Sequence, residues 1–261
     1  MLDELAWHIK LVESLSEIEA YYINSLIKYY ELKFGEKYNI ILDIPCGYGR
    51  HHKYLRELGY DVYGVDLSQD SINKAKTLYE KYNDKYFVGD MRNFKLNNIE
   101  ADVIINWFSS FGFFDDDDNL KTLKNFNNNL RKNGLLIIEM PNAKRSKERL
   151  RSTSLIDYND YGDYVEITEH TLVDDKYHLF NEKFYKKSGN DLIFEKEIKI
   201  KLRLYEIDEL VNMLKEAGFK VIEMYDTLTF KKIDLMSSSR VTIISLKNSF
   251  LSIGIGILTL T

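Results

Sequence analysis

The sequence has few of the residues that mark secreted or membrane-spanning proteins. It contains one cysteine and two prolines in 261 residues. A single cysteine cannot form an intramolecular disulfide or a cysteine-rich zinc site, which favours a reducing cytoplasm as the location. The N-terminus lacks the basic and apolar regions of a secretion signal. The apolar segment 250–261 is shorter than the ~20 residues of a spanning helix, so we expect no stable membrane insertion.

The chain also lacks an excess of positive charge. It has 36 Lys and Arg against 41 Asp and Glu, a net charge of -5. This balance disfavours a protein whose main partner is a nucleic acid, because binding to phosphates needs basic surface. The composition is 44% hydrophobic with 14 Phe and 19 Tyr, enough for a buried core. The length predicts one core domain with an added segment.

From residue 39 onward, short apolar runs alternate with amphipathic stretches, a pattern typical of a parallel sheet wound with helices. Both prolines, Pro45 and Pro141, come just after predicted strands, near the sheet edge at which ligands bind in such folds. The predicted strands are 40–44, 62–66, 86–88, 101–106 and 135–140, and the helices between them include 50–58, one beginning at Ser68, and 120–130.

The segments around this core predict further units. Residues 1–38 have the apolar spacing of one or two amphipathic helices that cover the core, and 143–152 resemble a charged helix. Residues 153–204 are predicted to be an insertion with three antiparallel strands, which acts as a lid over the sheet edge. The strands are 164–172, 177–187 and 192–204, followed by a helix at 206–217 and strands at 219–225 and 240–246. The core domain is then 39–152 with 205–247, and 248–261 form an apolar tail without an assigned role.

A Gly-rich turn after the first strand predicts a nucleoside site. Asp43 ends the strand, and Gly47 and Gly49 let backbone approach a ligand closely. Asp66 ends the second strand, where a carboxylate can accept hydrogen bonds from a ribose diol. A dinucleotide site needs a third glycine, which is missing here. At the third strand, the segment 89–91 (Gly-Asp-Met) offers a carboxylate and an apolar side chain to an adenine.

These segments resemble the class I S-adenosylmethionine-dependent methyltransferases. The resemblance rests on 42–51 (LDIPCGYGRH), 64–68 (GVDLS), 89–92 (GDMR) and 106–114 (NWFSSFGFF). It implies an α/β fold, with a Rossmann-like, seven-stranded, mostly parallel sheet covered by helices on both faces. It also implies S-adenosyl-L-methionine as cofactor and S-adenosyl-L-homocysteine as its product. Related small-molecule N-methyltransferases, including those acting on amino sugars, share the GDMR element.

The resemblance assigns roles to individual residues. Asp43 and the carbonyls of Pro45 and Cys46 would orient the methionine amino group, and Arg50 would pair with the methionine carboxylate. Asp66 would hold the ribose. The other implied cofactor residues are Gly47 and Gly49 at the turn, Leu67, Gly89, Asp90 and Met91 around the adenine, and Asn106 and Phe108 beside the sulfonium. The predicted substrate-binding residues are Ser109, Ser110, Phe111, Phe113 and Phe114.

The sequence does not identify a catalytic base. The amino-sugar methyltransferases have a histidine just after the Ser-Ser-x-Gly element, where this chain has Phe113 and Phe114. A base is needed only if the nucleophile arrives protonated. The unranked candidates are Tyr161, His170, His178, Tyr205 and Asp115.

The remaining polar residues have simpler interpretations. Cys46 fits a small packed residue better than a nucleophile, and His51 and His52 fit structural hydrogen bonding. The acidic run 115–118 fits a helix N-terminus rather than a metal site, and we expect no metal. The basic run 144–151 fits a solvated helix face, although it could also contact an anionic substrate.

The sequence therefore predicts a methyltransferase that acts on a nitrogen or oxygen nucleophile of a small molecule, as a monomer or homodimer. A methyltransferase acting on RNA or protein is the runner-up, although such an enzyme should show a basic platform or an added recognition domain. A nucleoside-binding protein without catalysis and an NAD-dependent oxidoreductase are less favoured, and the missing third glycine argues against the oxidoreductase.

Overall fold

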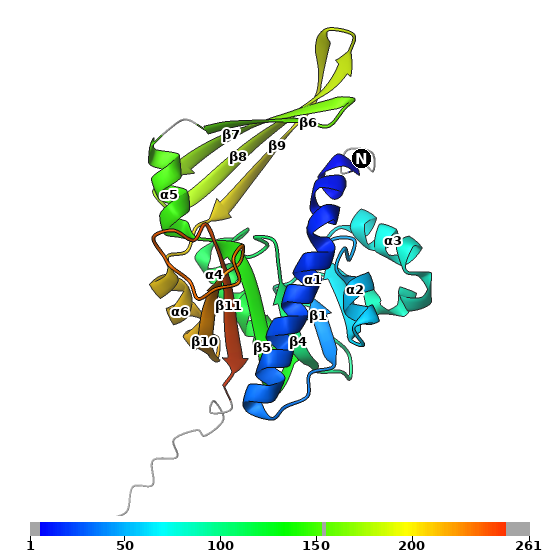
Figure 1. The fold of residues 1–261 in the computed structure, drawn as a ribbon, viewed down its shortest axis with the longest axis vertical. Helices are drawn as coiled ribbons and strands as arrows, with labels where there is room; N and C mark the ends of the chain where they lie inside the picture. Colours follow the sequence, from blue (N-terminus) through cyan, green and yellow to red (C-terminus); the bar gives the residue numbers. More distant parts are fainter. Residues whose placement is uncertain (1–5, 153–154, 249–261) are drawn as a thin grey trace, which may run out of the picture.

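The computed structural model describes residues 6–152 and 155–248, and its centre is a seven-stranded sheet (Figure 1). The strand order is β10-β11-β5-β4-β1-β2-β3, with β11 antiparallel to both of its neighbours and the other pairs parallel. The strands are β1 (Ile40–Asp43), β2 (Asp61–Asp66), β3 (Tyr86–Val88), β4 (Ala101–Asn106), β5 (Leu130–Pro141), β10 (Phe219–Asp226) and β11 (Arg240–Lys247). The predicted fold class is confirmed.

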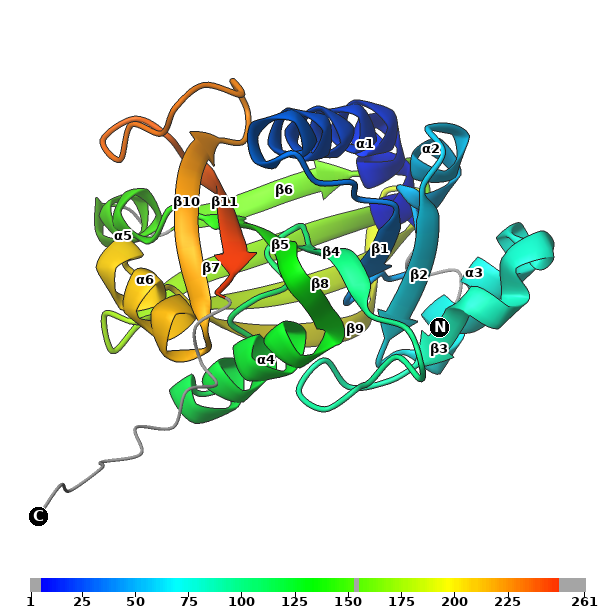
Figure 2. The ribbon, with the colours of Figure 1, turned by 90° about the horizontal axis from the view of Figure 1, so that it is seen from below.

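Helices cover both faces of this sheet, because its central strands are apolar on both sides (Figure 2). Every residue of β4 is buried. One face is covered by α1 (Ala6–Phe34) and α2 (His52–Glu57), and the other by α4 (Asp116–Asn129) and α6 (Ile207–Glu216). The N-terminal cover is thus a single helix over the described residues. The remaining helices are α3 (Gln69–Leu78), η1 (Glu80–Lys85) and α5 (Ala143–Ser152).

The helices begin where the sequence provides capping side chains. The hydroxyl of Ser68 accepts a hydrogen bond from the Ser71 backbone at the start of α3. Asp115 caps α4 by accepting from the Asp118 backbone, and the rest of the acidic run forms the first turn. The interpretation of this run as a helix N-terminus is therefore confirmed.

A second sheet lies beyond the carboxyl edge of the main sheet (Figure 1). Its four antiparallel strands are β6 (Leu155–Asp160), β7 (Tyr164–Val173), β8 (Tyr177–Ser188) and β9 (Asp191–Arg203). The prediction of three strands was wrong, because β6 was missed. Its sequence, LIDYND, is short and half polar, and it becomes a strand by pairing along β7.

The described residues include no helix that is long and apolar enough to cross a membrane. The predicted apolar tail at 248–261 lies outside the described residues, apart from Asn248, whose backbone N–H donates to the Gly218 carbonyl.

Candidate functional site

The turn after β1 forms the base of the candidate site. Gly47 and Gly49 adopt positive φ angles of 56° and 75°. The Cys46 N–H donates to the Val65 carbonyl at 2.8 Å, which ties the turn to β2. A Cβ on Gly47 would meet no protein atom within 4 Å, whereas one on Gly49 would lie 2.8 Å from the His52 ring. The turn therefore needs Gly49 for its own packing and leaves space above Gly47 for a ligand.

Asp66 holds two backbone segments at the end of β2. Its Oδ2 accepts from the Gly47 N–H and its Oδ1 from the Ser68 N–H, both at 2.8 Å. Burial raises the pKa of this carboxyl, as does the nearby Asp43, while the two backbone donors act against that rise. Each carboxylate oxygen keeps a further acceptor site. This arrangement suits a ligand that donates two hydrogen bonds, such as a ribose diol.

Asp43 is held by a buried histidine. Its Oδ2 lies 3.0 Å from His52 Nε2, and His52 Nδ1 lies 2.8 Å from the Tyr86 hydroxyl. Burial lowers the pKa of His52, so the neutral ring donates to Asp43 and accepts from Tyr86. The predicted structural role of His52 is confirmed, and Asp43 is oriented by this contact.

Helix α1 reaches the site through Glu19. Its carboxylate lies 2.5 Å from Arg50 Nη1 and 2.9 Å from His51 Nε2. Burial raises the pKa of Glu19, but the His51 hydrogen bond and the charge of Arg50 outweigh it and leave the pKa lowered. Arg50 is therefore anchored rather than free, and its predicted contact with a carboxylate would be made beside Glu19.

Asp90, at the end of β3, forms a two-point pair with Arg92. Arg92 Nε donates to both Asp90 oxygens at 3.0 Å, and Arg92 also pairs with Asp118 on α4. The hydrogen bond from Arg92 lowers the pKa of Asp90. The Arg92 guanidinium lies 4.2 Å from the centre of the Phe114 ring. These contacts orient the predicted adenine-binding loop.

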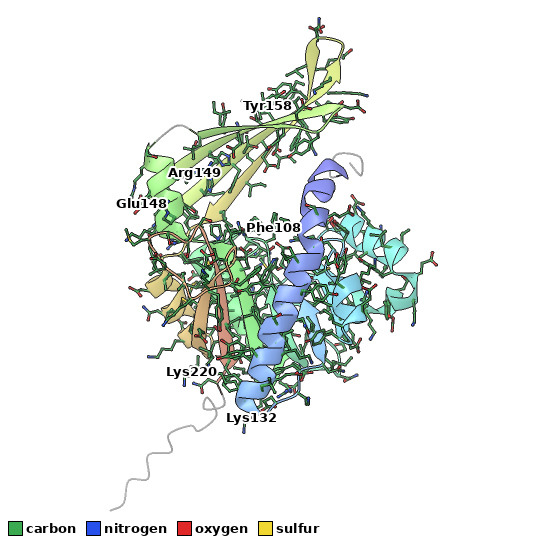
Figure 3. All side chains as sticks on the ribbon, in the orientation of Figure 1. Phe108, Lys132, Glu148, Arg149, Tyr158 and Lys220 are labelled. Carbon is green, nitrogen blue, oxygen red and sulfur yellow. The ribbon has the colours of Figure 1, made fainter. Side chains whose placement is uncertain are left out.

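The loop after β4 is strained. Phe108 and Ser109 have φ angles of 60° and 61°, a conformation that side chains other than glycine rarely adopt. Ser109 is held by backbone and side-chain oxygens of Glu139, and its hydroxyl accepts from Arg240 at 2.7 Å. The Phe108 ring is 51% exposed and lies between the two sheets (Figure 3). Such strain is found mostly at functional sites.

These elements surround a cavity of about 620 Å³ at the carboxyl ends of β1, β2, β3 and β4. Many of the residues predicted to bind cofactor lie on its wall, as do three of those predicted to bind substrate. They are Asp43, Pro45, Cys46, Gly47, Arg50, Asp66, Leu67, Gly89, Asp90, Met91 and Phe108, with Ser110, Phe113 and Phe114. Gly49 and Asn106 lie behind the wall, and the Asn106 amide donates to the Ile44 carbonyl at 2.8 Å.

A second cavity of about 930 Å³ lies between the second sheet and the main sheet. It shares Phe108 and Phe113 with the first cavity, so the two adjoin at these rings. Its wall also contains Ser109, His170 and His178 among the predicted residues. From α5 it includes Arg145 and Arg149, so the basic helix faces this cavity instead of being only a solvated face.

Several predicted site residues lie outside both cavities. Phe111 is fully buried and packs on Tyr205, so its predicted place in the pocket floor is wrong. Tyr205 donates to Asp116, Tyr161 donates to Glu166, and Asp115 caps α4. The four consecutive apolar or aromatic positions 111–114 contain glycine at 112, and the sequence does not reveal which rings face inward.

Sequence reasoning also missed residues of the first cavity. Trp107 lies on its wall, and its indole N–H is buried without a partner among the described residues. Tyr48, Ser71 and Lys74 also line it. Tyr48 and Trp107 lie inside two of the four recognised motifs, so their position was a signal. Ser71 and Lys74 lie on α3, outside these motifs, and the sequence gave no signal for them. No group of three or more His, Cys, Asp or Glu side chains in the described part of the chain is placed to hold a metal ion.

The order of the seven strands, with a cavity at the carboxyl ends of the parallel ones, defines an α/β fold of the class I methyltransferase type. The family described as "Methyltransferase domain" matches residues 41–134. An uncharacterized methyltransferase of Schizosaccharomyces pombe is 43% identical over 54 residues, which are 20% of this chain and 37% of the relative. The chain thus spans little more than a third of that curated relative.

Solved structures are similar to this chain over a longer part of its length than the sequence relative. A S-adenosylmethionine-dependent methyltransferase from Clostridium acetobutylicum is 18% identical, with a TM-score of 0.75 over 88% of this chain and 90% of the other. An amino pentose methyltransferase from Micromonospora echinaspora, solved with S-adenosylmethionine bound, is 14% identical, with a TM-score of 0.65 over 89% of this chain and 92% of the other. The chain has the fold of the class I methyltransferases, to which it adds the four-stranded antiparallel sheet.

Proposed function

We propose that the protein transfers a methyl group from S-adenosyl-L-methionine to a nitrogen or oxygen nucleophile of a small molecule. The observation that carries this proposal is the pair of adjoining cavities. One is lined by the residues predicted to bind a nucleoside, and the other is lined in part by the second sheet. The first would hold the cofactor and the second the acceptor. Phe108 and Phe113, shared by both walls, mark where the methyl group would pass between them.

The residues of the first cavity fit this cofactor. Asp66 would accept hydrogen bonds from the ribose, and the open space above Gly47 would admit the ligand close to the backbone. The exposed side chain of Leu67 would cover the adenine. Arg50 would bind the methionine carboxylate. S-adenosylmethionine would supply an electrophilic methyl group bonded to a sulfonium.

The residues of this chain would contribute alignment and exclusion of water. An in-line displacement needs the nucleophile and the methyl carbon held at close distance, and it proceeds poorly when water competes. The aromatic rings of Phe108, Phe113 and Phe114 would provide an apolar surface at that point. The second sheet would close the acceptor side as a lid.

A small acceptor is supported by the second cavity of about 930 Å³ and by the acidic net charge of -5. The structural match to the amino pentose methyltransferase covers 89% of this chain, which makes amino sugars suitable first compounds to try. A cytoplasmic location belongs to the same proposal and rests on the single cysteine. RNA and protein acceptors are outcomes of the test below.

The first prediction concerns Asp66. We expect the purified chain to bind S-adenosylhomocysteine in calorimetry, and Asp66→Ala to weaken binding about 10–100-fold, since two hydrogen bonds to a charged group are lost. Asp61→Ala is the matched control on the same strand, because Asp61 pairs with Lys85 at the opposite end. Binding of a nicotinamide dinucleotide in place of S-adenosylhomocysteine would contradict the proposal.

The acceptor is identified with methyl-labelled S-adenosylmethionine and three fractions of a cell extract: small metabolites, RNA and proteins. We expect the label in the small-metabolite fraction. Label found only in RNA or protein would keep the methyltransferase and overturn the small acceptor.

A further inference from the structure

Three polar side chains lie in a row on the cavity-facing side of the second sheet. Directly opposite residues of antiparallel strands share a face, and every second residue returns to that face. Asp157 is opposite Thr168, and His170 is opposite Phe180, so the register puts Asp157, His170 and His178 on one face. His170, His178 and Phe180 line the second cavity, which identifies this face as the one turned toward the acceptor.

The three side chains are connected by two hydrogen bonds. Asp157 Oδ2 lies 3.0 Å from His170 Nε2, and His170 Nδ1 lies 3.0 Å from His178 Nε2. A carboxylate only accepts, so His170 carries its proton on Nε2 and its neutral Nδ1 is an acceptor. His178 must then donate from Nε2. Its Nδ1 is left with a free lone pair, at the end of the chain furthest from Asp157.

The surroundings of His178 disfavour its protonated, positively charged form. Its pKa is lowered to about 4 by burial, by the neighbouring His170 and by Arg149, with Asp157 acting weakly in the other direction. Other charged groups on the cavity wall are Arg145 and Glu148 on α5, Glu182 on β8 and Arg240 on β11; β9 contributes the apolar Ile200 and Leu202. His170, in contrast to His178, is in direct contact with the Asp157 carboxylate.

We propose that Asp157, His170 and His178 form a proton relay that deprotonates the methyl acceptor, with His178 Nδ1 as the group that touches it. This inference rests on the proposed function. His178 is the catalytic residue in it, and His170 and Asp157 are positioning residues. The relay lets His178 accept a proton without holding the charge.

The step balances in atoms and charge. The acceptor's N–H or O–H proton moves to His178 Nδ1, while the Nε2 proton of His178 moves to His170 Nδ1. The acceptor's electron pair forms the new bond to the methyl carbon, and the S–CH₃ bond breaks with its electrons left on sulfur. His178 ends neutral, and the positive charge lies on His170 beside Asp157. After product release, His178 Nδ1 loses its proton to water, and the proton on His170 Nδ1 returns to His178 Nε2.

The first test needs no acceptor. The full chain, labelled with ¹⁵N-histidine and saturated with S-adenosylhomocysteine at pH 8, is studied by NMR for the ring nitrogen that carries each proton. We expect Nε2–H on both His170 and His178. A proton on His178 Nδ1 at this pH would overturn the relay, because no lone pair would then face the acceptor. Failure of S-adenosylhomocysteine to bind would instead refute the proposed function.

The second test measures labelled methyl incorporation into the small-metabolite fraction. We expect His178→Gln to lower the rate about 100-fold and Asp157→Asn about 10-fold, with the half-saturating S-adenosylmethionine concentration unchanged, and Asp157→Glu to recover part of the rate. Asp160→Asn is the matched control, because Asp160 is on the same strand but pairs with Lys187. The inference fails if His178→Gln keeps the wild-type rate. Glu182 is the competing base, because its pKa is raised to about 7. The inference therefore also fails if Glu182→Gln abolishes methyl transfer while His178→Gln does not.

Discussion

At the scale of single residues, the site depends on contacts between segments far apart in the sequence. Gly64 on β2 is an example. A Cβ there would lie 2.8 Å from the His52 ring, 2.9 Å from Cys46 Sγ and 2.9 Å from the Tyr86 ring. The absence of a side chain at Gly64 therefore lets the turn after β1 and the pair between His52 and Asp43 pack against β2. Nothing in the local sequence of β2 indicates that position 64 must lack a side chain.

Gly64→Ala should reduce the free energy of unfolding by about 1–3 kcal/mol, because an added methyl in a packed interior forces its neighbours to move. Urea denaturation measures the change. Gly162→Ala provides the comparison, since a Cβ at Gly162 meets no atom within 4 Å and its cost arises only from the φ of 84°. Equal stability of wild type and Gly64→Ala would contradict this prediction, because it would show that His52, Cys46 and Tyr86 can move aside without cost.

The residues recognised from sequence were those inside contiguous motifs. Asp66 could be assigned because strand, turn and helix follow one another within 42–68, and the cavity brings them together. Glu19 could not be assigned, since its contact with Arg50 and His51 depends on how α1 crosses the sheet. Phe111 was misplaced because a loop with positive φ angles at Phe108 and Ser109 does not alternate regularly between inside and outside.

At the scale of elements, the second sheet is an addition to a complete core. The residues of the first cavity come from β1 to β4 and the loops and helices that follow them, and none lies between 155 and 201. The second sheet joins the core before the predicted boundary at residue 204. Leu202 and Arg203 are buried. The Arg203 backbone N–H donates a hydrogen bond to the Gly112 carbonyl, and its guanidinium donates to Asp116 and Glu209.

Replacing residues 155–200 by a short Gly-Ser linker should leave S-adenosylhomocysteine affinity within about threefold of wild type and abolish methyl transfer. The reason is that the first cavity, proposed to hold the cofactor, keeps all of its lining residues, whereas one wall of the second cavity is removed. Calorimetry and labelled methyl incorporation measure the two effects. Full turnover without these strands would exclude their action as a lid.

At the scale of the whole molecule, burial of histidines couples stability to pH. Burial is the main cause that lowers the pKa of His51, His52 and His178 in the folded protein. The unfolded chain binds these protons near pH 6.5, whereas the folded protein binds them only at lower pH. Their contribution to stability is therefore complete above pH 6.5 and is lost as the pH falls. Glu182, whose pKa is raised to about 7, acts in the opposite direction between pH 4.5 and 7.

We therefore expect the free energy of unfolding to be smaller at pH 5.5 than at pH 7.5, since three histidines outweigh one glutamate. Urea denaturation at both values measures the difference. His178→Gln should reduce the difference, because it removes one of the three groups. A larger free energy of unfolding at pH 5.5 would show that Glu182 and other raised carboxyls dominate.

The sheet, its helices and the wall of the first cavity follow from the order of residues along the chain. Apolar strands and glycine turns act locally, and the carboxyl ends of neighbouring parallel strands necessarily meet at one edge. The second cavity and the contacts around it depend on the tertiary structure. The pairing that makes β6 a strand, the row from Asp157 to His178, and the contact of Glu19 with Arg50 join segments separated by many residues. Such contacts depend on packing and register, which a local pattern does not contain.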